Sequence, residues 1–110
     1  MLAEPIEEEI DDVKPLILII EDNNDIALYL KSLLIERYRV ITAWNGEEGL
    51  IMAQKNIPDL VITDLMMPVK DGCVFTCELK QNRLLNHIPV IMLTAKSSDE
   101  DRIKGLRCGV

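Results

Sequence analysis

Four short apolar segments recur along the chain, and helical patterns separate them. The segments cover residues 16–20, 40–43, 60–63 and 90–93 and are rich in Ile, Val and Leu. They lack the apolar–polar alternation of a strand that is half exposed to solvent. Runs of this length and composition are typical of strands that are buried on both faces of a parallel sheet. The pattern therefore predicts four parallel strands.

Amphipathic patterns between these segments predict helices. The first predicted helix has an N-cap at Asn23 or Asn24 and one apolar stripe, formed by Ile26, Leu30, Leu33 and Leu34. Capping residues at Asn45, Asp71 and Ser97 mark three further helices. The alternation of strands and helices predicts an α/β fold, in which helices cover both faces of a parallel sheet.

Composition and charge divide the chain into a leader and one domain. The 110 residues carry a formal net charge of -7, and the acids between Glu4 and Asp12 account for -6 of it, which leaves -1 for the rest. Residues 1–13 are therefore expected to be a solvated acidic leader or linker, and residues 14–110 the domain. An acidic chain of this kind argues against a nucleic-acid surface. Because no apolar run reaches the length of a membrane span and no signal peptide is visible, we expect a cytoplasmic chain without membrane contact.

Polar residues whose side chains can act as ligands or nucleophiles follow three of the four predicted strands. Glu21 and Asp22 follow the first segment, Asp64 follows the third, and Thr94 follows the fourth. Ligands of open parallel sheets bind beyond the carboxyl ends of the strands. Taken singly, Asp64 fits a helix cap as well as a nucleophile. The joint occurrence of Glu21, Asp22, Asp64 and Thr94 at one expected edge favours a common site. Trp44, directly after the second segment, is expected to pack in the interior.

The chemistry of this carboxylate cluster favours a divalent cation. Neighbouring carboxylates repel one another and cannot all stay ionised cheaply without a cation. Oxygen ligands of this kind suit Mg²⁺, which also shares its coordination with phosphate groups. In such a site Asp64 is the natural nucleophile, because a carboxylate can form an aspartyl phosphate.

Three motifs in this order resemble the receiver domain of two-component response regulators. They are Ile-Ile-Glu-Asp-Asn at 19–23, Thr-Asp-Leu-Met-Met-Pro-Val-Lys-Asp-Gly at 63–72, and Ile-Pro-Val-Ile-Met-Leu-Thr-Ala-Lys at 88–96. The resemblance covers residues 14–110. It implies a flavodoxin-like, doubly wound parallel sheet with the strand order 2-1-3-4. It also implies a phosphoacceptor signalling domain rather than an enzyme.

The resemblance assigns a role to each candidate residue. Asp64 matches the phosphoacceptor, and Glu21 and Asp22 match the acidic pair that holds Mg²⁺ together with Asp64 and the backbone carbonyl of Met66. Thr94 matches the switch hydroxyl. The implied partner is a sensor histidine kinase or a phosphotransfer domain, and the acidic leader suggests a hybrid sensor kinase. Met66 also predicts slow loss of the phosphoryl group, because a thioether cannot orient an attacking water.

One departure from the receiver pattern leaves an alternative open. Receivers continue into a fifth strand with a lysine that contacts the phosphoryl group, and this sequence ends before it, so the fifth strand and fifth helix are expected to be absent. A pseudo-receiver that acts only as an interaction module is therefore the alternative function. An apolar fourth strand at the sheet edge also predicts a homodimer or swapped elements. A hydrolase of the haloacid-dehalogenase type would need an aspartate at position 66, where this chain has Met66.

Overall fold

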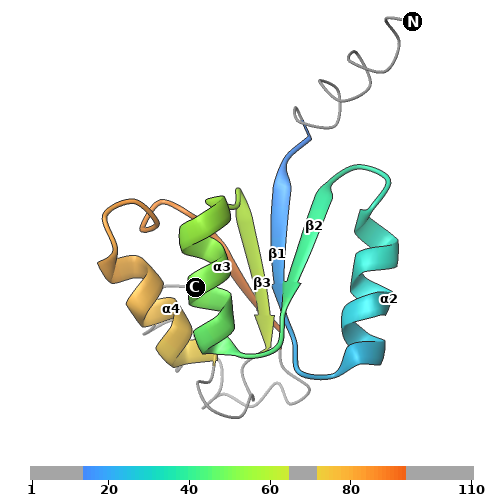
Figure 1. Ribbon diagram of the computed structural model, residues 1–110, viewed down its shortest axis with the longest axis horizontal. Helices are drawn as coiled ribbons and strands as arrows, with labels where there is room; N and C mark the ends of the chain where they lie inside the picture. The colour runs from blue at the N-terminus through green and yellow to red at the C-terminus, as the bar shows by residue number, and fades with distance from the viewer. Residues whose placement is uncertain (1–13, 65–71, 94–110) are drawn as a thin grey trace, which may run out of the picture.

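The computed structural model describes residues 14–64 and 72–93, which form a parallel sheet with helices on both faces (Figure 1). In chain order the elements are β1 (Leu16–Ile20), α2 (Asn24–Leu34), β2 (Arg39–Ala43), α3 (Gly46–Asn56), β3 (Leu60–Asp64), α4 (Gly72–Gln81) and β4 (Val90–Leu93). The sheet order is β2-β1-β3-β4, which confirms the predicted doubly wound fold. The expected acidic leader, the helix after Ser97, Met66 and Thr94 lie outside the described residues.

Strand β1 is the buried centre of the sheet. Its sequence Leu-Ile-Leu-Ile-Ile has no polar side chain, and all five residues are buried. It pairs in parallel with β2 on one side and with β3 on the other. A strand with neighbours on both edges and helices over both faces meets no water, which is why it needs no alternating pattern.

The amino ends of β1 and β3 are fixed to each other by Asp59. The backbone N–H of Leu16 donates to Asp59 Oδ2 at 2.8 Å, and the backbone N–H of Asp59 donates to the carbonyl oxygen of Leu16, also at 2.8 Å. This reciprocal pair sets the register in which Ile20 lies beside Thr63 at the other end of the two strands. A slip of one residue would reverse the faces of all β3 side chains, so this register decides which residues meet beyond the strands.

Helices α3 and α4 cover one face of the sheet, and α2 covers the other (Figure 1). The main core lies under α3 and α4 and includes Leu18, Ile20, Val61, Phe75 and Leu79. Gly49 allows α3 to approach closely, because a Cβ atom there would lie 2.4 Å from Ile20 Cδ1 and 3.4 Å from Phe75 Cε1. None of the helices in the described part of the chain is long and apolar enough to span a membrane.

The apolar stripe predicted for the first helix is partly wrong. In α2, Ala27 is buried, whereas Ile26 and Leu33 are 45% and 61% exposed. Leu30 and Leu34 are half-buried, as expected. The small Ala27 lets the helix lie close to the sheet, so the contact face is centred on Ala27 rather than on the larger side chains beside it. Sequence hydrophobicity gives alanine too little weight to reveal this orientation.

Candidate metal and phosphoacceptor site

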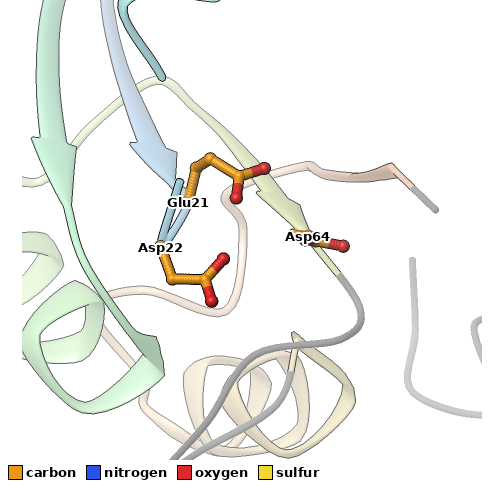
Figure 2. A group of neighbouring side chains, drawn as sticks. All are labelled: Glu21, Asp22 and Asp64. Atoms are coloured by element: carbon orange, nitrogen blue, oxygen red, sulfur yellow. The ribbon is translucent and has the colours of Figure 1, made fainter. Parts of the chain in front are cut away.

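Three carboxylates meet at the carboxyl ends of β1 and β3. Glu21 and Asp22 come directly after β1, and Asp64 is the last residue of β3 (Figure 2). One oxygen from each carboxylate can be chosen so that all three lie within 4.8 Å of one another. Glu21 is buried, Asp64 is half-buried and Asp22 is exposed. The predicted clustering of Glu21, Asp22 and Asp64 is therefore observed.

The strand ladder explains how two acids that are distant in sequence become neighbours. Ile20 of β1 lies beside Thr63 of β3, so the next residue on each chain is Glu21 and Asp64. On its other side, the backbone N–H of Glu21 donates to the carbonyl oxygen of Ala43 at 3.0 Å. The ladder thus extends one residue beyond β1 and holds the backbone of Glu21 in place, while the chain turns away at Asp22.

Glu21 has an environment that disfavours its charge. Burial raises the pKa of the Glu21 carboxyl above its usual value, and the backbone N–H of Asn23 partly opposes this by donating to Glu21 Oε2 at 3.0 Å. A side-chain hydrogen bond with Asp22 and the negative charges of Asp64 and Asp22 raise the pKa further. Such repulsion is relieved when a cation binds between the carboxylates. The electrostatics therefore fit a cation site.

Asn23, which the sequence indicated only as a helix cap, also contributes to the environment of the acids. Its Oδ1 accepts from the backbone N–H groups of Asp25 at 2.9 Å and Ile26 at 3.1 Å, which begins α2 directly after the acids. The N-terminus of a helix carries partial positive charge, and it stabilises nearby anions. The cap at Asn23 thus places the positive end of α2, as well as its own N–H, beside the acidic group.

The donor set suits a hard divalent cation. Carboxylate oxygens from two strand ends are the ligands that Mg²⁺ takes in phosphate-handling sites, where it keeps several waters. Asp22 is exposed and Asp64 is half-buried, so two of the three acidic residues contact solvent. A phosphate-bearing molecule can reach them from solvent, and the arrangement is therefore chemically suited to phosphoryl transfer onto a carboxylate.

Comparison with known proteins identifies the family. The model of the response regulator receiver domain matches residues 17–110. The chain belongs to the response regulator receiver family. Among solved structures, this receiver resembles the Vibrio cholerae chemotaxis protein CheY4 with a TM-score of 0.84 and 30% sequence identity, over 89% of this chain and 82% of that chain. It also resembles the receiver domain of a Syntrophus aciditrophicus signal transduction histidine kinase, with a TM-score of 0.81 and 38% identity, over 87% and 74% of the two chains.

Relatives of this receiver include both kinases and regulators. It is 38% identical over 97 residues to hybrid signal transduction histidine kinase D of Dictyostelium discoideum, covering 88% of this chain and 6% of that protein. It is 36% identical over 108 residues to histidine kinase P4 of Formosa agariphila, covering 94% and 8%. The receiver thus spans less than a tenth of the length of these two kinases. The PhoP regulator of Bacillus subtilis is 39% identical over 94 residues, covering 84% and 38%.

One residue at the site differs from its sequence prediction. Trp44 was expected to pack in the interior, but it is 58% exposed. It follows Ala43, the last residue of β2, which is only 1% exposed. The predicted segment, residues 40–43, ends at Ala43 as β2 does, and the chain leaves the interior there. The expectation for Trp44 was wrong because a hydrophobic side chain directly after a strand need not be buried.

Proposed function

We propose that this receiver accepts a phosphoryl group on Asp64 from a phosphohistidine of a sensor histidine kinase or phosphotransfer domain. The observation that carries the proposal is the meeting of Glu21, Asp22 and Asp64 within 4.8 Å in a receiver fold. The kinases among its relatives support a histidine-borne donor. Membership of a hybrid kinase polypeptide, a cytoplasmic location and the absence of nucleic-acid contact stay predictions.

The cation is proposed to be Mg²⁺, held by Glu21, Asp22 and Asp64, with the backbone carbonyl of Met66 as a further ligand from the sequence resemblance. When bound, Mg²⁺ neutralises the charge between Asp64 and the phosphoryl oxygens. Glu21 supports this assignment. Burial and neighbouring acids raise the pKa of its carboxyl, and a bound cation would stabilise the charged carboxylate that this environment disfavours.

The transfer step needs only groups that the site and the donor supply. A carboxylate oxygen of Asp64 attacks phosphorus while the P–N bond to the donor imidazole breaks. The imidazole leaves as a neutral group when its other nitrogen carries a proton. The product is a mixed anhydride on Asp64, and Thr94 is proposed to turn its hydroxyl toward the new phosphoryl oxygens. A new charge at the strand end would then shift the receiver between two populations.

The test is phosphorylation by a small donor. We expect Mg²⁺ with acetyl phosphate to add one phosphoryl group per chain, detected by intact mass spectrometry. Asp64→Asn should abolish this addition, because an amide is not a nucleophile of comparable strength. Glu36→Gln is the matched control: it makes the same change from carboxylate to amide at an exposed acid outside the cluster, and the mutant should be modified like the parent.

The pseudo-receiver alternative predicts a different result. In that case beryllofluoride and acetyl phosphate leave the chain unmodified even when Mg²⁺ is bound. Binding is measured independently through the fluorescence of Trp44, the only tryptophan, during a Mg²⁺ titration. Saturable Mg²⁺ binding without modification of Asp64 would favour an interaction module over a phosphoacceptor.

A further inference from the structure

Helix α2 is apolar on the side that faces solvent as well as on the side that faces the sheet. Leu28, Tyr29 and Leu33 are 64%, 63% and 61% exposed, and we call these three residues the outer face of α2. Tyr29 and Leu33 lie one turn apart and form a stripe, with Leu28 beside it. Single exposed apolar residues need no explanation, but a helix that is apolar all round is normally covered on both sides. The outer face is therefore expected to have an occupant.

The acidic leader, residues 1–13, joins the described domain beside the C-terminal end of α2. Arg39, the first residue of β2, holds this junction: its Nε donates to the carbonyl oxygen of Lys14 at 3.0 Å, and its backbone N–H donates to that of Pro15 at 2.9 Å. Figure 1 shows the amino ends of β1 and β2 at the same edge of the sheet as the end of α2. A segment tethered at this point meets the outer face at a high effective concentration.

The leader has the sequence pattern of a helix with one apolar side. Ile6, Ile10 and Val13 are spaced by four and three residues, which places them on one side of a helix, and Pro5 suits the first helical position. Residues 5–13 would span about 14 Å as a helix, against about 17 Å for the 11 residues of α2. The leader therefore has both the apolar stripe and the length to cover most of the outer face.

Charge complementarity supports the same pairing. Lys31, Arg37 and Arg39 are exposed around the C-terminal end of α2, and Glu36 is the only acid in that stretch of sequence. The last acids of the leader, Asp11 and Asp12, precede the junction at Lys14 directly. Acids at the C-terminus of a helix are unfavourable by themselves, so a leader helix needs basic neighbours of this kind.

We infer that the leader packs as a helix along the outer face of α2, with its apolar stripe toward that face and its last acids beside the basic residues. A second copy of the chain is the less favourable occupant, because two chains with a formal net charge of -7 each repel one another. In this arrangement the leader is a fixed part of the domain and shields an apolar surface. The inference does not depend on phosphoryl transfer.

Digestion of the full chain with a glutamate-specific protease tests the docking, because a docked helix resists cleavage. Intact mass follows the cuts after Glu7, Glu8 and Glu9. Leu33→Ser should raise the initial rate of these cuts about tenfold by releasing the leader, and Val13→Ser should do so from the other side of the contact. The double variant should be cut no faster than either single variant, because one contact can be lost only once.

Matched controls separate docking from unfolding and from general surface effects. Leu84 is 72% exposed in the connection between α4 and β4, and Leu84→Ser should leave the leader rate within about twofold. Lys31→Gln should raise the rate several-fold at low salt and less at high salt, whereas Lys55→Gln, in the last turn of α3, should not. Cuts after Glu48 and Glu78, which lie within helices, report unfolding and should stay absent.

Four results would overturn the inference. The parent leader is cut as fast as the leader of Val13→Ser, which cannot itself unfold the domain. The effects of Leu33→Ser and Val13→Ser multiply in the double variant. Lys31→Gln leaves the leader rate unchanged at low salt. Leu33→Ser lowers the mass of the chain in light scattering while Leu84→Ser does not, which assigns the outer face to a second copy.

Discussion

Among the described residues, Glu21 has a pKa that burial and neighbouring acids clearly raise. Its carboxyl is buried, hydrogen-bonded to Asp22 and close to the charge of Asp64, and all three conditions raise its pKa. Between the usual carboxyl pKa and the raised pKa of Glu21, the folded metal-free chain therefore holds a proton at Glu21 that the unfolded chain has already released. Its free energy of unfolding must fall as pH rises from the usual carboxyl range through the raised pKa of Glu21.

Replacing this carboxyl should stabilise the metal-free protein. We expect Glu21→Gln to raise the free energy of unfolding at pH 7 by on the order of 1 kcal/mol, because it removes one of three mutually repelling charges. The variant should also lose part of the pH dependence and bind Mg²⁺ more weakly. Urea unfolding at several pH values, with and without Mg²⁺, measures both effects. Glu36→Gln, at an exposed acid outside the cluster, is the control, and an equal gain there would contradict the explanation.

Met66 carries a prediction that depends on sequence alone, since it lies outside the described residues. A thioether cannot orient a water molecule for attack on an aspartyl phosphate, whereas an amide can. Met66→Asn should therefore shorten the half-life of phosphorylated Asp64, by about tenfold if orientation contributes about 1.4 kcal/mol. The half-life is followed by intact mass after removal of acetyl phosphate. A longer half-life in the mutant would refute the hypothesis.

Residue positions at the site were predictable because the sheet has strict topology. Glu21, Asp22 and Asp64 each stand at the carboxyl end of an apolar segment, and parallel pairing brings such ends to one edge. The raised pKa of Glu21 could not be predicted, because it depends on burial by segments that are distant in sequence. The exposure of Trp44 was equally hidden, since hydropathy does not reveal where a chain leaves the interior.

Among the elements, helix α3 depends on one glycine. A Cβ atom at Gly49 would lie 2.4 Å from Ile20 Cδ1, and the backbone of Ile20 is fixed in the centre of the sheet. The helix can therefore pack over β1 and against α4 only while position 49 has no side chain.

Gly49→Ala should destabilise the fold despite the higher helix propensity of alanine. Overpacking costs about 1–3 kcal/mol, and the gain in propensity offsets roughly 1 kcal/mol of it. Since the close approach to Ile20 belongs in the upper half of that range, about 2–3 kcal/mol, we expect a net loss of about 1–2 kcal/mol in thermal or urea unfolding. Because Ile20 precedes Glu21, Mg²⁺ affinity should also fall. Gln54→Ala, at an exposed position of the same helix, should change stability by less than about 0.5 kcal/mol. An unchanged or higher stability of Gly49→Ala would show that Ile20 can move aside.

Strands were easier to predict than helix faces. The bounds of β1 and β4 agree with the predicted segments, and β2 and β3 are each one residue longer, through Arg39 and Asp64. A continuous apolar run marks a buried strand directly. Helix α2 shows the opposite case, because which of its apolar residues face the sheet depends on how closely Ala27 can approach.

At the scale of the whole molecule, β4 is the edge strand of the described sheet that exposes large apolar side chains. Among the described residues β4 pairs only with β3, and Ile91 and Leu93 are 47% and 40% exposed. Strand edges of this kind invite pairing with another chain. The homodimer predicted from the sequence therefore stays a prediction, with this edge as its interface.

Light scattering after gel filtration tests it. We expect the 110-residue chain to show a concentration-dependent mass above that of a monomer. Ile91→Lys should shift the population toward the monomer, because edge lysines oppose strand pairing. Leu84→Lys adds the same charge at an exposed apolar position outside the strand and should have little effect. A uniform monomer at every concentration would contradict the prediction.

The central position of β1 has a consequence in time. Its five apolar residues are synthesised before its partner β3, which ends at Asp64, 44 residues after Ile20. At about 5–20 residues per second, synthesis of that interval takes about 2–9 s. During this period one edge of the most apolar strand has no native neighbour. The nascent chain is thus prone to misassociation through the open edge of β1 until Asp64 has been made.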